Sequence, residues 1–67
     1  MPRYTIDLGE KLDRLLETLS ASHDTTKSEI IRRAVASYAY LDEERNEGRK
    51  IAIVDDENKT VKEVVLP

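Results

Sequence analysis

The sequence predicts a mainly α protein with short β elements, in the order strand, helix, helix and β-hairpin. Three observations support this: a segment in which polar and apolar residues alternate, two stretches with apolar residues at helical spacing, and an aliphatic tail interrupted by a polar turn. No repeat or low-complexity tract interrupts the 67 residues. We expect a main domain over residues 1–48 and a hairpin extension over residues 49–67.

The first predicted element is a strand over residues 3–8. Tyr4, Ile6 and Leu8 alternate with polar residues, which is the period of a half-buried strand. Gly9 then interrupts the alternation. This strand stands alone in its half of the chain, so its backbone groups need a partner from the tail hairpin or from another chain.

The second predicted element is a helix over residues 10–22. Its four leucines have the spacing of one apolar stripe on a helix: Leu12, Leu15, Leu16 and Leu19. Residues 21–24 are expected to form the end of this helix and a short turn. His23 lies in that turn, where exposure to solvent is the expected state.

A second helix is predicted to begin at Thr26. Thr26 and Glu29 have the spacing of a capping box, in which each side chain bonds the other residue's backbone N–H. The apolar stripe of this helix ends at Leu41, the next six residues are polar on every face, and Gly48 is the expected stop. The stripe consists of Ile30, Ile31, Ala34, Val35, Tyr38 and Leu41.

The tail is predicted to form a β-hairpin. Residues 51–54 and 61–66 are mostly aliphatic and flank a polar turn of four or five residues within 55–59. Its aliphatic side chains must be covered, because a bare segment of this kind aggregates. They can pack on the helices of the same dimer, pair with the tail of another subunit to build a tetramer, or receive a different protein by strand addition.

Size and composition limit the function. A chain this small buries only roughly 60% of its unfolded surface, so a second subunit is the expected source of further core. The sequence contains no cysteine and one histidine, which argues against disulfides and structural zinc. It also lacks a glycine-rich phosphate loop, a Cys–His pair and a membrane-length apolar run. We expect a cytoplasmic protein that is not an enzyme, has no cofactor and does not enter a membrane.

Charge points to a local rather than a global nucleic-acid site. The net charge is −3, and the acidic excess lies in residues 41–67, whereas residues 1–40 are balanced. A polyanion would therefore meet the N-terminal part. There, a ribbon of two paired strands would direct Arg3, Thr5 and Asp7 outward and would fit the major groove. The alternative is an edge strand with a solvated polar face.

The start of the second helix offers a phosphate site. Its unpaired N–H groups and its dipole attract an anion, and Thr26, Lys27 and Ser28 lie there. Arg32 and Arg33 follow, and they are expected either to remain solvated or to pair with Glu29 and other acidic neighbours.

Residues 2–42 resemble the ribbon-helix-helix (MetJ/Arc/CopG) family. The resemblance rests on the segment Arg3-Tyr4-Thr5-Ile6-Asp7-Leu8, the leucine-striped helix, and the capped second helix from Thr26 to Val35. It implies an intertwined homodimer whose N-terminal strands read DNA bases through Arg3, Thr5 and Asp7. Phosphate contacts are implied at Thr26, Lys27 and Ser28. Asp7 departs from the basic or neutral polar residue usual at its position. The implied dimer core is Tyr4, Ile6, Leu8, Leu12, Leu15, Leu16, Leu19, Ile30, Ile31, Ala34, Val35 and Tyr38.

The sequence therefore predicts a homodimeric transcriptional repressor that binds double-stranded operator DNA and regulates its own operon, with higher-order assembly on DNA as a further option. The alternative function is that of an antitoxin that neutralises a toxin protein through residues 49–67. The residues expected to bind a protein partner are Ile51, Ile53, Val61, Val64, Val65 and Leu66.

Overall fold

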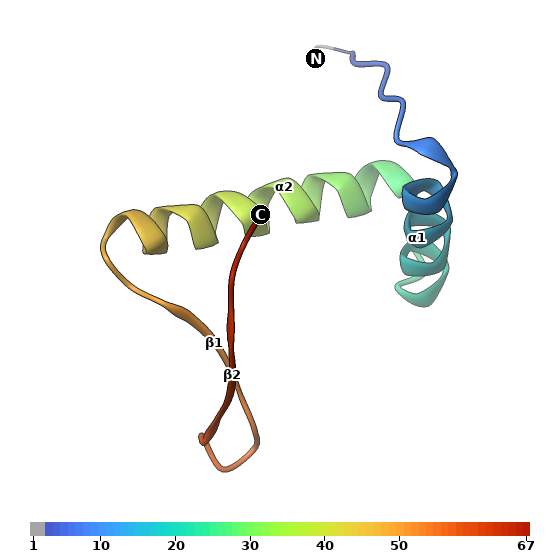
Figure 1. Ribbon diagram of the computed structural model, residues 1–67. Coiled ribbons are helices and arrows are strands. Elements are labelled where there is room, and N and C mark those ends of the chain that lie inside the picture. Colours follow the sequence, from blue (N-terminus) through green and yellow to red (C-terminus); the bar gives the residue numbers. More distant parts are fainter. Residues whose placement is uncertain (1–2) are drawn as a thin grey trace. The chain divides into compact units, whose positions relative to one another are not determined.

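A computed structural model describes residues 3–67 and shows two helices followed by a two-stranded sheet (Figure 1). The elements are α1 (Gly9–Ser22), α2 (Lys27–Asn46), β1 (Ile51–Val54) and β2 (Thr60–Val64). The chain divides into two units, Met1–Ala34 and Val35–Pro67, with the boundary inside α2. Within the described range, no helix has the length and apolar character needed to cross a membrane.

The predicted strand over residues 3–8 is absent from the single chain. This segment has no regular secondary structure, and the sheet formed by residues 3–67 contains only β1 and β2. The physical reason is that a strand requires a hydrogen-bonded neighbour, which one copy of the chain does not provide.

Helix α1 begins one residue earlier than predicted, at Gly9. Gly9 has φ +73°, and its N–H donates to Asp7 Oδ1 at 3.3 Å. The interruption expected at Gly9 is confirmed, because this left-handed conformation favours glycine. At the other end, the N–H of Thr25 donates to the carbonyl of Ser20 at 2.9 Å. Asp24, with φ +50°, provides the left-handed residue that closes the helix.

Helix α2 confirms one half of the expected capping box and shows that the other half is wrong. The Glu29 N–H donates to Thr26 Oγ1 at 3.1 Å, which caps the helix. The Glu29 carboxylate does not return to the Thr26 N–H; it accepts hydrogen bonds from Arg32 and Arg33. Two guanidinium groups within reach bind a carboxylate more strongly than one neutral amide does.

The polar residues after Leu41 continue the helix to Asn46. The N–H of Gly48 donates to the carbonyl of Arg45 at 2.9 Å, and the N–H of Arg49 donates to that of Glu44 at 3.1 Å. Together with φ +83° at Gly48, these bonds form a Schellman motif. The stop predicted at Gly48 is confirmed.

The hairpin is confirmed, with a loop of five residues over 55–59. Asp55 organises the loop: its Oδ1 accepts hydrogen bonds from the N–H of Glu57 at 2.9 Å and of Lys59 at 3.0 Å. Strand β2 covers Thr60–Val64 and ends two residues before the predicted limit at Leu66. The antiparallel pairs are Ile51↔Val64, Ala52↔Glu63, Ile53↔Lys62 and Val54↔Thr60, so Val61 is an extra residue on β2.

The end of the chain is bonded to α2 within the second unit. The Tyr38 hydroxyl donates to the carbonyl oxygen of Pro67 at 3.1 Å, and Arg45 Nη1 donates to that of Leu66 at 3.4 Å. The sequence predicts Tyr38 in the core, but the residue is 46% exposed and contributes its hydroxyl to this contact.

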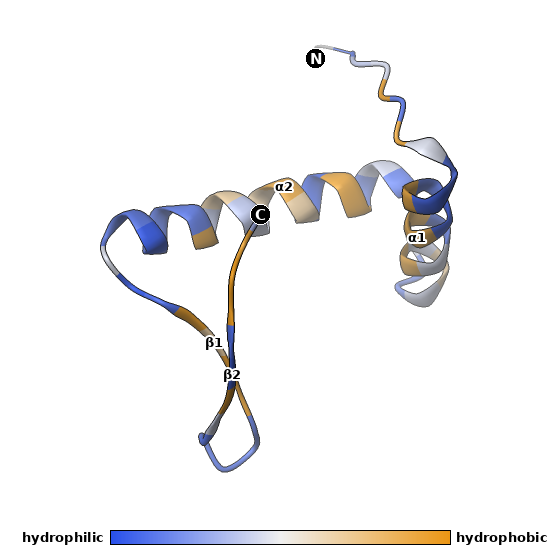
Figure 2. Cartoon of the chain, viewed as in Figure 1, coloured by the Kyte–Doolittle hydropathy of each residue, from blue (hydrophilic) through white to orange (hydrophobic). Residues whose placement is uncertain are grey.

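A single chain does not assemble the predicted core. Among the described residues, Ile30 is the only buried hydrophobic side chain, at 7% exposure. The apolar residues of α1 and of the first half of α2 are nevertheless evident in Figure 2. Several predicted core residues are exposed within one copy: Tyr4, Ile6, Leu12, Leu15, Leu19 and Val35. The chain thus forms amphipathic elements without burying their apolar faces.

The end of α2 provides a test of the backbone geometry. Replacing Gly48 by Ala should lower the free energy of unfolding by about 1 kcal/mol, because a Cβ is disfavoured at φ +83°. A Cβ built at Gly48 meets no atom within 4 Å, so crowding does not contribute. Urea denaturation measures the difference.

Gly48→Asn is the matched variant, since asparagine tolerates the left-handed region and should retain most of the stability. Equal losses in the Ala and Asn variants would contradict this explanation of the helix end.

Candidate nucleic-acid interface

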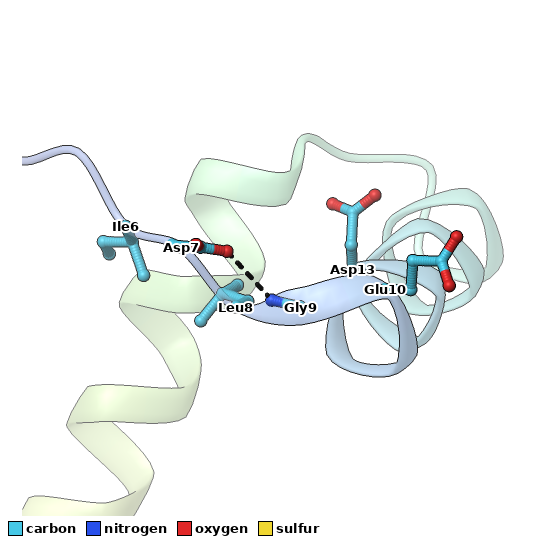
Figure 3. Close-up of a pocket in the computed structure, with 6 residues that line it drawn as sticks. All are labelled: Ile6, Asp7, Leu8, Gly9, Glu10 and Asp13. Carbon is cyan, nitrogen blue, oxygen red and sulfur yellow. Dashed lines mark hydrogen bonds between the residues drawn. The ribbon is translucent and has the colours of Figure 1, made fainter.

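The predicted base-reading residues all lie on the exposed segment before α1. Arg3, Thr5 and Asp7 are exposed, and no ion pair links Arg3 to another residue in the range 3–67. Asp7 differs from the other two because its carboxylate bonds the Gly9 N–H at the start of α1 (Figure 3). The sequence did not predict this role for Asp7, although a carboxylate just before a helix is a familiar signal for it.

The surface beside Asp7 is acidic. Figure 3 shows a shallow pocket lined by Ile6, Asp7, Leu8, Gly9, Glu10 and Asp13. Three of these side chains are carboxylates, so the pocket repels phosphate. Within residues 3–67, no three His, Asp or Glu side chains are grouped so that they could hold a metal ion. The predicted phosphate-binding residues of this unit lie elsewhere, at the start of α2.

The predicted phosphate residues begin α2. The Thr26 hydroxyl oxygen accepts the Glu29 N–H, and its proton can still be donated. Ser28 is exposed in the first turn. Lys27 is more constrained, because its Nζ lies 3.0 Å from Asp13 Oδ1 and 3.3 Å from Glu17 Oε1 on α1.

These two carboxylates raise the pKa of the Lys27 ammonium group. The hydrogen bond that Lys27 donates to Asp13 is the largest cause. Burial opposes it, and the hydrogen bond donated to Glu17 and the charges of both carboxylates add to the increase. Lys27 is therefore positively charged at neutral pH and half-exposed. A phosphate that binds here would compete with Asp13 and Glu17 for the ammonium.

The role of Asp13 and Glu17 was missed from the sequence. Their spacing of four residues places both on one face of α1, which was a usable signal. The signal did not identify Lys27 as their partner, because the contact joins residues that are ten and fourteen positions apart.

Arg32 and Arg33 are paired rather than simply solvated. Arg32 Nε lies 2.8 Å from Glu29 Oε1, and Arg33 Nε lies 2.9 Å from Glu29 Oε2. The two guanidinium groups, Arg32 first, lower the pKa of Glu29 to about 2. The same contact raises the pKa of Arg32. One carboxylate thus holds two cations in place beside the start of α2.

The Glu29 cluster makes a pH-dependent contribution to stability. The pKa of Glu29 is lowered by folding, so its ionised form stabilises the native state above the ordinary value of 4.5. This contribution is lost as the pH falls toward about 2. We expect Glu29→Gln to be destabilising at pH 7 and to differ progressively less from the original protein below pH ~4.5.

The direct measurement is an NMR titration of the Glu29 side-chain carboxyl carbon, with Glu57 in the hairpin loop as the comparison carboxylate. A Glu29 midpoint near its ordinary value would show that the ion pairs do not persist in solution.

Comparison with known proteins gives a family match that spans the N-terminal segment, α1 and most of α2. Residues 3–44 match the model of a family described as ribbon-helix-helix protein, copG family. No curated protein and no solved structure matches the chain significantly. The matched segment covers more than half of the chain and contains Arg3 through the greater part of α2. Proteins of this family are DNA-binding transcription regulators that bind DNA as dimers. The chain therefore belongs to the copG family of ribbon-helix-helix proteins.

Proposed function

We propose that this protein is a homodimeric, sequence-specific DNA-binding repressor that acts on the promoter of its own operon. The observation that carries the proposal is the family match over residues 3–44. That segment contains both predicted DNA-contacting groups. Repression follows if the bound dimer blocks RNA polymerase, and two-fold symmetry requires a palindromic or repeated operator.

A single copy leaves backbone groups unpaired and apolar side chains exposed, which supports the need for a second copy. Residues 3–8 have no strand partner, and Tyr4 and Ile6 on this segment are 81% and 54% exposed. Pairing two such segments across a two-fold axis satisfies their backbone groups. It also brings the leucine faces of two α1 helices into one core, which covers Leu12 and Leu15, each 51% exposed in one copy.

The paired segments would direct Arg3 and Thr5 into the major groove. Arg3 can bind guanine O6 and N7 with two parallel hydrogen bonds, and Thr5 can bond a base edge or contact a thymine methyl group. We assign Asp7 mainly to positioning the start of α1, because it already accepts the Gly9 N–H. Any base contact by Asp7 would be with cytosine N4.

The start of α2 would hold the DNA backbone on each side of the ribbon. Thr26, Lys27 and Ser28 supply a hydroxyl, an ammonium and a second hydroxyl around unpaired helix N–H groups. Lys27 would exchange Asp13 and Glu17 for a phosphate, and these carboxylates moderate its affinity for any polyanion. Specificity would then depend on Arg3 and Thr5.

The test is a footprint of the purified protein on the DNA upstream of its own gene, followed by binding measurements with variants. Arg3→Ala should weaken specific binding by about 1–3 kcal/mol and relax the preference for one base. Lys27→Ala is the comparison: it should weaken binding to all sequences similarly. It should also reduce the slope of log K against log salt by about 0.9 for each phosphate that the variant no longer neutralises.

Operator affinity that does not change in Arg3→Ala would overturn the assignment of the ribbon. A folded protein that protects no DNA would overturn the proposed function itself.

A second candidate function, that of an antitoxin, is favoured by the exposed aliphatic side chains of the hairpin. Val61 and Val65 are 61% and 83% exposed in one copy. A toxin-sized gene directly downstream, and loss of its neutralisation on removal of residues 49–67 with DNA binding retained, would support this function.

A further inference from the structure

The two edges of the hairpin differ in chemistry. Within residues 3–67, β1 pairs only with β2, so each strand keeps one unpaired edge (Figure 1). Strand β2 has charged Lys62 and Glu63 at its centre and the extra residue Val61, and such features block the addition of another strand. Strand β1 reads Ile-Ala-Ile-Val without a charge or an extra residue. The unprotected edge of the hairpin is therefore β1.

The charged residues that flank β1 favour antiparallel pairing of two copies of this strand. Arg49 and Lys50 precede the strand, and Asp55 and Asp56 follow it. In an antiparallel pair of two copies, the basic end of each strand lies beside the acidic end of the other. A parallel pair would instead place like charges together, which is destabilising.

We propose that β1 pairs with β1 of a second copy of this chain, antiparallel about a two-fold axis, and so joins two hairpins into a four-stranded sheet. The two-fold axis is perpendicular to the sheet. Paired residues therefore project from the same face of the sheet, and the residue at the axis lies opposite the same residue of the second copy. Centring on Ala52 places Ile51 opposite Ile53 of the second copy and Arg49 opposite its Asp55. The small side chain of Ala52 then lies at the axis.

This register groups compatible side chains on one face. Ile51 and Ile53 project from the same side of β1, and Arg49 and Asp55 continue the same alternation in the residues that flank the strand. Val64, opposite Ile51 on β2, extends the apolar area of this face. Ile53 is 45% exposed in one copy, so the neighbouring isoleucine has surface to cover. Pairing also satisfies the outer backbone groups of β1.

The charged ends remain able to make the new contacts. Arg49 Nη1 contacts Glu44 Oε2 at 3.3 Å, which leaves other guanidinium N–H groups for a second carboxylate. The two loop bonds of Asp55 both use Oδ1, so Oδ2 can accept from Arg49 of the second copy. By contrast, self-pairing of β2 centred on Lys62 or on Glu63 would place like charges opposite each other.

Cysteine cross-linking tests the pairing in the full chain, which contains no cysteine of its own. In the proposed register, the two Ala52 Cα atoms lie roughly 4.5–5.5 Å apart, within disulfide range. Ala52→Cys should therefore become a covalent dimer under mild oxidation. Val54→Cys is on the same strand and face but should lie roughly 13 Å from its copy, so cross-linking should be at least ten-fold slower.

Three further variants test which strand edge pairs and whether charge guides the pairing. Val61→Cys is exposed on β2 and should cross-link as slowly as Val54→Cys. In the Ala52→Cys chain, Arg49→Glu should slow cross-linking by placing Glu opposite Asp55, whereas Lys62→Glu makes the same charge change away from the pairing edge and should not slow it.

Folding of every variant is verified by circular dichroism, and none of these readouts depends on DNA binding. Equal rates for Ala52→Cys and Val61→Cys would overturn the proposal. A folded Ala52→Cys chain that does not cross-link would also overturn it, and would leave the β1 edge to a strand from a different protein.

Discussion

The unpaired backbone of residues 3–8 is the constraint on which the account depends. A strand needs hydrogen bonds to a neighbour, and the sheet within residues 3–67 contains β1 and β2 alone. The same chain leaves Leu12, Leu15 and Val35 largely exposed and buries only Ile30 among its described apolar residues. In the proposed dimer, a second copy would resolve both deficits at once, since it would pair the segment and cover the leucine faces. The DNA-reading surface would then exist only in the assembled protein, where two Arg3 side chains share one ribbon.

The helix ends are defined by hydrogen bonds that form within the single chain. Helix α1 ends at a left-handed Asp24, and α2 begins at the Thr26 cap and ends at a left-handed Gly48. These boundaries depend on hydrogen bonds within a few residues, so each copy forms them alone. They determine where the first turn of α2 lies relative to α1, and the bonds of Lys27 to Asp13 and Glu17 strengthen that arrangement. The residues of the predicted phosphate site are thus positioned by contacts within one copy, whereas the proposed ribbon would depend on contacts between copies.

The sequence predicted the elements better than the contacts. The two helices, the cap at Thr26, the stop at Gly48 and the five-residue hairpin loop follow from periodicity and from residues with strong local preferences. The strand over residues 3–8 is absent from one chain, because an alternating pattern indicates that a segment is able to pair and does not supply its partner. The contacts of Lys27 with α1 were not predicted from the sequence. The pairing of Glu29 with Arg32 and Arg33 was one of two alternatives that the sequence left open. Both contacts were difficult to predict because several carboxylates compete for each cation. The roles of Arg3, Thr5 and Ser28 on DNA remain predictions.

The central claim is that residues 3–8 become a strand only through a second copy. Amide hydrogen exchange of the full chain, followed residue by residue at high and at low protein concentration, tests it most directly. The account predicts that alternate amides of this segment exchange slowly at high concentration and lose that protection on dilution, whereas the amides within α2 that bond along the helix keep more of theirs. Rapid exchange throughout residues 3–8 in a protein that is demonstrably dimeric would contradict the account.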